Sequence, residues 1–123
     1  MPQGVPSIAP RDAAAAVDSS AAVGPSALIV DVREPDEFAS ERIAGVVLMP
    51  ISQFVARHAE LPKDRPLLML CAAGSRSSSA TMYLLQAGWT DVRNITGGMI
   101  GWRSAGLPIV SGTPQPGEGD LPG

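Results

Sequence analysis

The stretch that decides the fold is Leu67-Leu68-Met69-Leu70-Cys71-Ala72-Ala73-Gly74-Ser75-Arg76-Ser77. A short apolar run, typical of a buried strand, ends at the cysteine, and a loop of small residues follows it. The next segment, 77–87, has apolar residues at helical spacing, and Gly88 follows as a stop signal. The sequence therefore predicts that a strand, a tight loop and the beginning of a helix meet at Cys71.

Apolar runs and helical patterns alternate along the rest of the chain. Buried strands are predicted at 27–32, 46–49, 67–70 and 91–95, with Ile8 as an edge strand. Helices are predicted at 11–19, 52–59, 77–87 and 99–104, with a short helical turn at 36–39. Strands separated by helices imply crossover connections. We therefore expect an α/β fold with a central, mostly parallel sheet of four to five strands.

The two ends of the chain differ from its middle in composition. Residues 1–6 contain two prolines and a glycine, and seven of the thirteen residues from 111 to 123 are Gly or Pro. Such segments bury too little apolar surface to offset the entropy lost on ordering. We therefore expect a flexible N-terminus at 1–6, one folded domain at 7–110 and a disordered tail at 111–123.

Composition restricts the class of protein. The chain has 123 residues, 45% of them hydrophobic, which suits one domain with a buried core. Its net charge of −3 argues against nucleic acid or an anionic membrane as partner. No apolar run approaches the roughly 18 residues of a membrane span, and the first residues do not resemble a secretory signal. The single cysteine excludes an internal disulfide and a cysteine-rich zinc site, so we expect a cytoplasmic protein.

Cys71 is the candidate nucleophile. Ligands of a parallel sheet bind beyond the carboxyl ends of its strands, and Cys71 lies at such an end. Small side chains after it let the backbone amides converge on one point, where the helix dipole adds positive potential. A thiolate there is stabilised, so its pKa should fall. The alternative is a buried structural cysteine, which is common, but the small-residue loop and the arginine after it favour the nucleophile.

The loop after the cysteine supplies candidate binding groups. Gly74 can take the positive φ that a tight curl needs. Arg76 brings a planar, charged fork suited to oxyanions, and Ser75 and Ser77 bring hydroxyl groups. Ser77 also suits the N-cap of the helix. We therefore predict Cys71 as catalytic residue, no metal ligand, and the following substrate-binding residues: Ala72, Ala73, Gly74, Ser75, Arg76 and Ser77.

Four motifs in order make the chain resemble a single-domain rhodanese, a member of the sulfurtransferase family. They are 28–38 (LIVDVREPDEF), 42–46 (RIAGV), 71–77 (CAAGSRS) and 97–108 (GGMIGWRSAGLP). The resemblance covers about residues 8–110, and it departs at Arg42, where the family usually has a histidine that forms a local hydrogen bond. It implies a rhodanese-like fold with helices on both faces of the sheet, and a persulfide on Cys71.

The resemblance also implies a reaction. Cys71 would take the outer sulfur of a donor such as thiosulfate and pass it to a thiophilic acceptor: cyanide, a thiol or a sulfur-carrier protein. Arg76 would orient the oxyanion part of the donor. No metal or organic cofactor is implied.

Two alternatives to this function remain. One is a non-catalytic or regulatory protein-binding module, against which the retained Cys71, Gly74 and Arg76 argue. The other is an arsenate reductase or phosphatase on the same fold. Cysteine-based phosphatases place one residue more between the cysteine and the arginine than the four found here, which makes a ring large enough for phosphate. The lack of a second cysteine argues against a disulfide-forming reductase.

Other polar residues have plainer interpretations. Asp31, Arg33 and Glu37 are predicted to form an ion-pair and capping network that holds the loop after their strand. His58, the only histidine, is predicted to lie at an exposed helix end rather than to act as a general base for Cys71. Trp102 resembles the packing tryptophan of the family.

Overall fold

The computed structural model describes residues 4–18 and 26–122. Its main sheet has the strand order β1-β6-β5-β2-β4, and every neighbouring pair in it is parallel. Its strands are β1 (Ser7–Ile8), β2 (Leu28–Asp31), β4 (Val47–Leu48), β5 (Leu67–Leu70) and β6 (Val92–Ile95). A separate antiparallel pair joins β3 (Glu41–Arg42) to β7 (Val110–Ser111).

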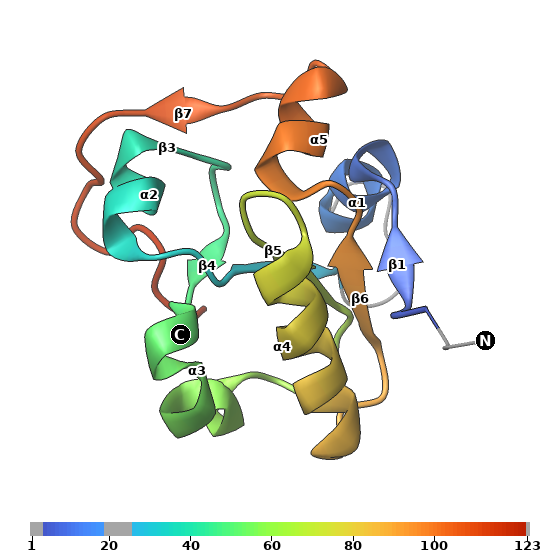
Figure 1. Ribbon diagram of the computed structural model, residues 1–123. Helices are drawn as coiled ribbons and strands as arrows, with labels where there is room; N and C mark the ends of the chain where they lie inside the picture. The colour runs from blue at the N-terminus through green and yellow to red at the C-terminus, as the bar shows by residue number, and fades with distance from the viewer. Residues whose placement is uncertain (1–3, 19–25, 123) are drawn as a thin grey trace.

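The helices fill the connections between these strands, as Figure 1 shows. They are α1 (Pro10–Val17), α2 (Pro35–Ser40), α3 (Ile51–Arg57), α4 (Ser75–Gln86) and α5 (Gly98–Ser104), with a 3-10 turn, η1 (His58–Glu60), after α3. None of the helices in the described part of the chain combines the length and apolar character that crossing a membrane requires.

Two apolar cores lie on opposite faces of the sheet, because successive side chains of a strand point to opposite sides. Val30 of β2 belongs to the core that α3 and α4 cover, whereas Ile29 belongs to the core that α1 and α5 cover. Strands β2 and β5 are buried throughout, as parallel strands with helices on both faces must be. The predicted α/β fold with a mostly parallel sheet flanked on both faces is confirmed.

Helix α4 begins earlier than its sequence pattern predicts. Gly74, at φ 110°, is the N-cap, and the helix starts at Ser75, passes in front of β5 and runs beside β6 (Figure 1). Ser77 is therefore the third residue of the helix, and its predicted N-cap role is wrong. The glycine takes the cap position because the chain must turn through a left-handed conformation there.

The C-terminal segment 111–122 lies against the domain, although its composition predicts disorder. The Leu48 N–H donates to the carbonyl of Gly119 at 2.8 Å, which extends β4 by one bridge. Buried Arg42 donates to the Glu118 carboxylate, with one N–O distance of 2.9 Å. Arg42, which stands where the family usually has histidine, thus anchors this segment, and composition alone cannot reveal such an anchor.

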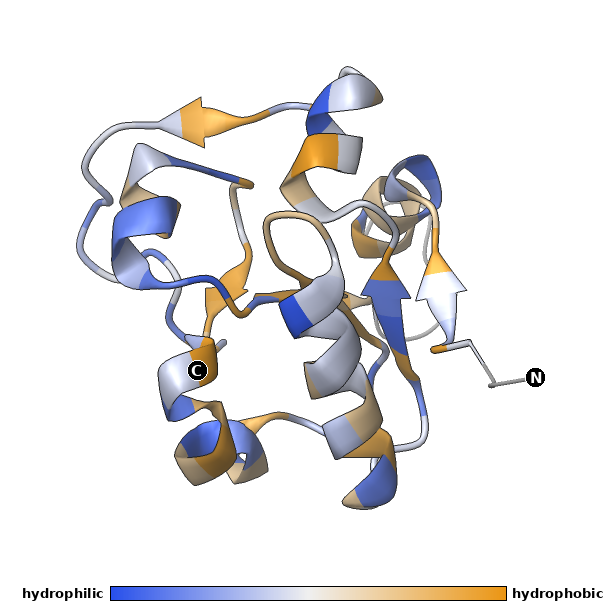
Figure 2. Ribbon diagram, in the orientation of Figure 1, coloured by the Kyte–Doolittle hydropathy of each residue, from blue (hydrophilic) through white to orange (hydrophobic). Residues whose placement is uncertain are grey.

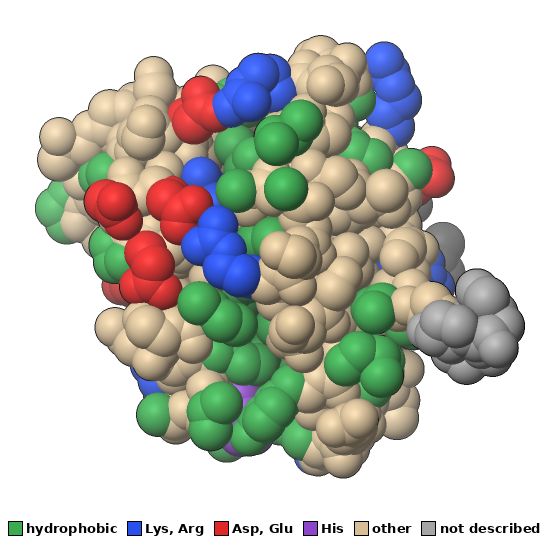
Figure 3. All heavy atoms as spheres, in the orientation of Figure 1, with side chains coloured by type: hydrophobic (Ala, Val, Ile, Leu, Met, Phe, Trp, Pro, Cys, Tyr) green, Lys and Arg blue, Asp and Glu red, His purple; other side chains and the backbone are tan. Residues whose placement is uncertain are grey.

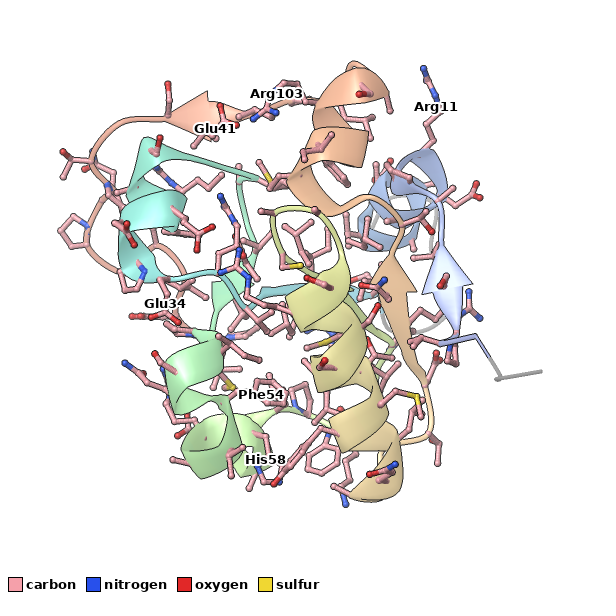
Figure 4. All side chains as sticks on the ribbon, in the orientation of Figure 1. Arg11, Glu34, Glu41, Phe54, His58 and Arg103 are labelled. Carbon is pink, nitrogen blue, oxygen red and sulfur yellow. The ribbon has the colours of Figure 1, made fainter. Side chains whose placement is uncertain are left out.

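At the N-terminal end, residues 1–3 lie outside the described part of the chain. The carbonyl of Pro6 accepts a hydrogen bond from the Asn94 N–H at 2.8 Å, and Ile8 pairs with Ile95. The predicted edge strand at Ile8 is confirmed. The short pair of β3 and β7 is further tied to α5 by an ion pair between Glu41 and Arg103, which point toward each other in Figure 4.

Candidate active site

Cys71 follows β5, the central strand of the main sheet, at its carboxyl end. Leu70, the residue before it, is paired with Asp31 at the end of β2. The Cys71 side chain is only 1% exposed. As predicted, a strand, a loop and the beginning of a helix meet at this residue.

Three groups that can donate a hydrogen bond lie within reach of the Cys71 sulfur. The N–H of Gly74 lies 3.0 Å from Sγ, the N–H of Ser77 lies 3.4 Å from it, and the Ser77 hydroxyl lies 3.2 Å from it. Burial raises the pKa of the Cys71 thiol, but the hydrogen bonds from Ser77, Gly74 and Ala73 outweigh burial, so the net pKa is lowered. The site therefore favours a thiolate, the nucleophilic form of cysteine.

The double glycine at 97–98 holds the loop from behind. A Cβ atom on Gly98 would collide with the carbonyl oxygen of Cys71. Without that atom, the first turn of α5 docks onto the loop: the Met99 N–H donates to the Cys71 carbonyl at 2.9 Å, and the Ile100 N–H donates to the Ala72 carbonyl at 3.1 Å. Because the carbonyls of Cys71 and Ala72 face α5, the backbone N–H groups that follow them in the loop face the sulfur.

Arg76 is already paired in this structure. Its two terminal nitrogens donate to the two carboxylate oxygens of Glu37 at 2.7 and 2.9 Å. The hydrogen bonds from Arg76 lower the pKa of Glu37 to about 2, and Glu37 raises the pKa of Arg76. Figure 3 shows acidic side chains gathered over α2, with a basic side chain between them and the start of α4. The fork predicted to read an anionic donor therefore binds the protein's own carboxylate.

Asp31 and Arg33 form the network that the sequence predicts. Both side chains are buried, and the Arg33 guanidinium donates to the two Asp31 carboxylate oxygens, at 2.7 Å for the shortest contact. Arg33 also donates to the carbonyls of Glu37 and Glu41. This network ties the end of β2 to α2, and so fixes Glu37 where it can meet Arg76.

The structure brings only some of the predicted binding residues to the sulfur. Gly74 and Ser77 contact it directly, and the Ala73 N–H lowers its pKa. In the described part of the chain, no hydrogen bond to the sulfur comes from Ala72, or from the side chains of Ser75 and Arg76.

His58 lies away from the loop. It is half-buried rather than exposed, because its ring packs against three aromatic rings, the nearest being Tyr83 at 4.8 Å between centroids. Its Nδ1 lies 2.8 Å from the Val55 carbonyl, and Figure 4 shows it beside Phe54 at the end of α3. Among the described residues, no hydrogen bond links His58 to Cys71.

Asn94 of β6 is the site residue that the sequence analysis missed. Its Oδ1 accepts from the Ser77 hydroxyl at 2.5 Å, and its Nδ2 donates to the Ser78 hydroxyl at 3.0 Å. The signal was available: alternation places Asn94 on the same buried face as Val92, and a buried amide needs partners. In Figure 2 much of β6 has the hydrophilic colour, because Arg93 and Asn94 stand between Val92 and Ile95.

Comparison with known proteins agrees with this geometry. The model of the rhodanese-like domain matches residues 10–105. The chain belongs to this family. A relative named sulfurtransferase, from Allochromatium vinosum, is 42% identical over 84 residues, which are 68% of this chain and 78% of that protein. The thiosulfate sulfurtransferase GlpE of Pseudomonas fluorescens is 40% identical over 81 residues, 63% of this chain and 72% of that one.

Solved structures support the same rhodanese-like fold. A crystal structure of a thiosulfate sulfurtransferase from Pseudomonas aeruginosa superposes with a TM-score of 0.76 at 32% identity. It covers 90% of this chain, which corresponds to 21% of that longer protein. The predicted membership of the rhodanese family is therefore confirmed.

Proposed function

We propose that this rhodanese-like protein is a sulfurtransferase in which Cys71 carries the transferred sulfur as a persulfide. The observation that carries the proposal is the ring of donors, Gly74 and Ser77, around a buried sulfur at the carboxyl end of β5. Relatives named sulfurtransferase at about 40% identity support the same reaction class.

The reaction consists of two displacements on sulfur. In the first, the Cys71 thiolate attacks the outer sulfur of thiosulfate: a bond forms between the two sulfurs, the bond to the sulfite group breaks, and sulfite leaves with the electron pair. In the second, a nucleophile such as cyanide or a thiolate attacks the terminal sulfur, and Cys71 leaves as thiolate. A covalent enzyme intermediate of this kind predicts ping-pong kinetics.

The loop stabilises the anionic sulfur in both displacements. N–H and O–H groups fixed before the reaction cost no reorganisation when charge develops on sulfur. The backbone N–H groups of Gly74 and Ser77 are fixed in this way, by the left-handed turn at Gly74 and by the first turn of α4. We infer that the resting thiolate and the persulfide, both anionic at the loop, are stabilised by the same donors.

We propose another role for Arg76 than the donor binding expected from the sequence. Because the Arg76 fork is bound to Glu37, we propose that Arg76 holds the start of α4 against α2 and does not orient the donor. The donor then meets the loop amides, and thiosulfate is one suitable substrate among sulfane-sulfur compounds. A thiol or carrier-protein acceptor and a cytoplasmic location stay predictions.

A paired assay tests the function. Purified protein should transfer sulfur from thiosulfate to cyanide and should not hydrolyse an aryl phosphate, since a phosphoryl group needs room for three equatorial oxygens. Cys71→Ser should abolish sulfur transfer, because the serine hydroxyl remains protonated and oxygen is a poor sulfur carrier. Ready phosphate hydrolysis without sulfur transfer would contradict the proposal.

A further inference from the structure

The Ser77 hydroxyl has more acceptors within reach than it has protons. Its oxygen lies 3.2 Å from the Cys71 sulfur, 3.2 Å from the Gly74 carbonyl and 2.5 Å from Oδ1 of Asn94. A hydroxyl donates one hydrogen bond and accepts up to two. Which of these neighbours takes the proton decides whether Ser77 stabilises an anionic sulfur.

Asn94 is the neighbour that can either take this proton or release it. Its amide both donates and accepts, and turning the amide by half a rotation exchanges the two roles. The residue is 7% exposed, and its register partner on β5 is Met69, two residues before Cys71. At its other end the amide meets the Ser78 hydroxyl at 3.0 Å, which can also donate or accept.

We propose that Asn94 is a positioning residue for the Cys71 sulfur, acting through Ser77. In the described orientation Oδ1 takes the Ser77 proton, and the Ser77 oxygen is left to accept from a neutral thiol. When the sulfur is anionic, the amide turns. Its Nδ2 then donates to the Ser77 oxygen, the Ser77 proton points at the sulfur, and Oδ1 accepts from Ser78.

The series of hydrogen bonds from Asn94 through Ser77 stabilises the anionic sulfur of Cys71 more than the neutral thiol. Hydrogen bonds to an ionised group are about twice as strong as those between neutral groups, and linked hydrogen bonds polarise one another. Removing the amide should therefore cost the thiolate more than the thiol. The inference rests on the proposed function only in treating Cys71 as the reacting group.

The charged groups near the loop have partners other than Asn94. Among the described residues, Arg76 of α4 interacts electrostatically with Cys71, and it also interacts with Asp31 of β2. Glu37 of α2 is bound to Arg76, and Asp31 is bound to Arg33. In the described part of the chain, none of these charged side chains forms a hydrogen bond with Asn94. A change in the pKa of the Cys71 thiol in an Asn94 variant therefore reports on Ser77.

The test is a double-mutant cycle on the pKa of the Cys71 thiol in the full chain. The pKa is measured from the pH dependence of alkylation by iodoacetamide, a readout that needs no sulfur transfer. Asn94→Ala should raise the pKa by about half a unit to one unit, the size expected from one ordinary hydrogen bond, because the amide bonds to Ser77 and not to the sulfur itself. Ser77→Ala should raise it by about one unit. When Ser77 is already alanine, adding Asn94→Ala should cause no further rise in the pKa of the Cys71 thiol.

Two further variants keep the cycle decisive. Asn94→Asp keeps the shape of the side chain but cannot donate, and it should raise the pKa at least as much as Asn94→Ala. Thr81→Val removes another buried hydroxyl of α4, one that bonds to the Ser77 carbonyl at 2.8 Å and not to the sulfur, and should leave the pKa unchanged. An unchanged or lowered pKa in Asn94→Ala, or an equal rise in both backgrounds, would overturn the proposal. If the pKa values follow the predicted pattern but the native protein transfers no sulfur, that result would count against the proposed function and not against the role of Asn94.

Discussion

The guanidinium of Arg76 and the carboxylate of Glu37 meet in two parallel hydrogen bonds, at 2.7 and 2.9 Å, beside the loop that follows Cys71. The pair joins the first turn of α4 to α2, and each side chain is about a third exposed (33% and 32%). The one cation of the loop is therefore matched by an anion that the chain itself supplies. This pairing is the basis of the proposal that Arg76 holds the site and does not read the donor.

Arg76→Ala should reduce kcat/KM for an anionic and an uncharged sulfur donor by similar factors. The loss acts through the position of α4 and through the Cys71 thiol, both of which the two donors share. Because the pair is partly exposed, the expected cost in stability is only about 1 kcal/mol, measured by urea unfolding. A loss confined to thiosulfate would show that Arg76 reads the donor after all.

Glu37→Gln should flatten the dependence of stability on pH in the acid range. The pKa of Glu37 falls from 4.5 to about 2 on folding, so its contribution is complete above about pH 4.5 and is lost as the pH falls toward 2. The glutamine side chain keeps the shape but carries no charge, so the variant should lose less stability over that window than the native protein. Urea unfolding at a series of pH values measures this, and parallel curves for the two proteins would contradict it.

Gly98→Ala should destabilise the protein more than the strain of placing alanine at a positive φ would by itself. The added Cβ would meet the Cys71 carbonyl, and overpacking of this kind costs about 1–3 kcal/mol. Gly45→Ala is the matched control, because Gly45 also has positive φ but nothing within 4 Å of an added Cβ. The melting temperature and sulfur-transfer rate should both fall further in Gly98→Ala. Equal effects would mean that close packing of α5 on the loop is unimportant.

Arg42→Ala should release the C-terminal segment without stopping catalysis. Arg42 bonds to Glu118 and to the Gly112 carbonyl, and Cys71 is not among its contacts in the described part of the chain. Limited proteolysis should cleave within 111–122 faster in the variant, while the rate of sulfur transfer changes little. Glu118→Gln should have the same effect in weaker form. Unchanged protection in both variants would contradict this anchoring role.

The sheet and the loop could be predicted because their signals are local. The apolar run at 67–70, the cysteine at its end and the glycine after it lie in one short stretch, so one segment specifies the strand, the turn and the donors. The resemblance to rhodaneses rests in addition on four motifs that follow one another in the order found in that family.

The partners of the site could not be predicted, because they come from distant segments. Glu37 lies 39 residues before Arg76, and nothing in either local pattern pairs them. Asn94 lies 17 residues after Ser77, and although its alternation with Val92 indicates burial, nothing local indicates Ser77 as its partner. The segment 111–122 is held by Arg42, and composition reports the entropy of a segment but not the contacts that offset it.

The most direct test of the central claim is the intact mass of the protein after incubation with thiosulfate. The account predicts a gain of one sulfur atom, its location on Cys71, its loss on adding cyanide, and its absence in Cys71→Ser. Ser75→Ala is a suitable control, because no hydrogen bond of the Ser75 side chain to the sulfur occurs in the described part of the chain, and it should still gain the atom. A folded native protein that gains no sulfur, or that gains it equally in Cys71→Ser, would contradict a persulfide on Cys71.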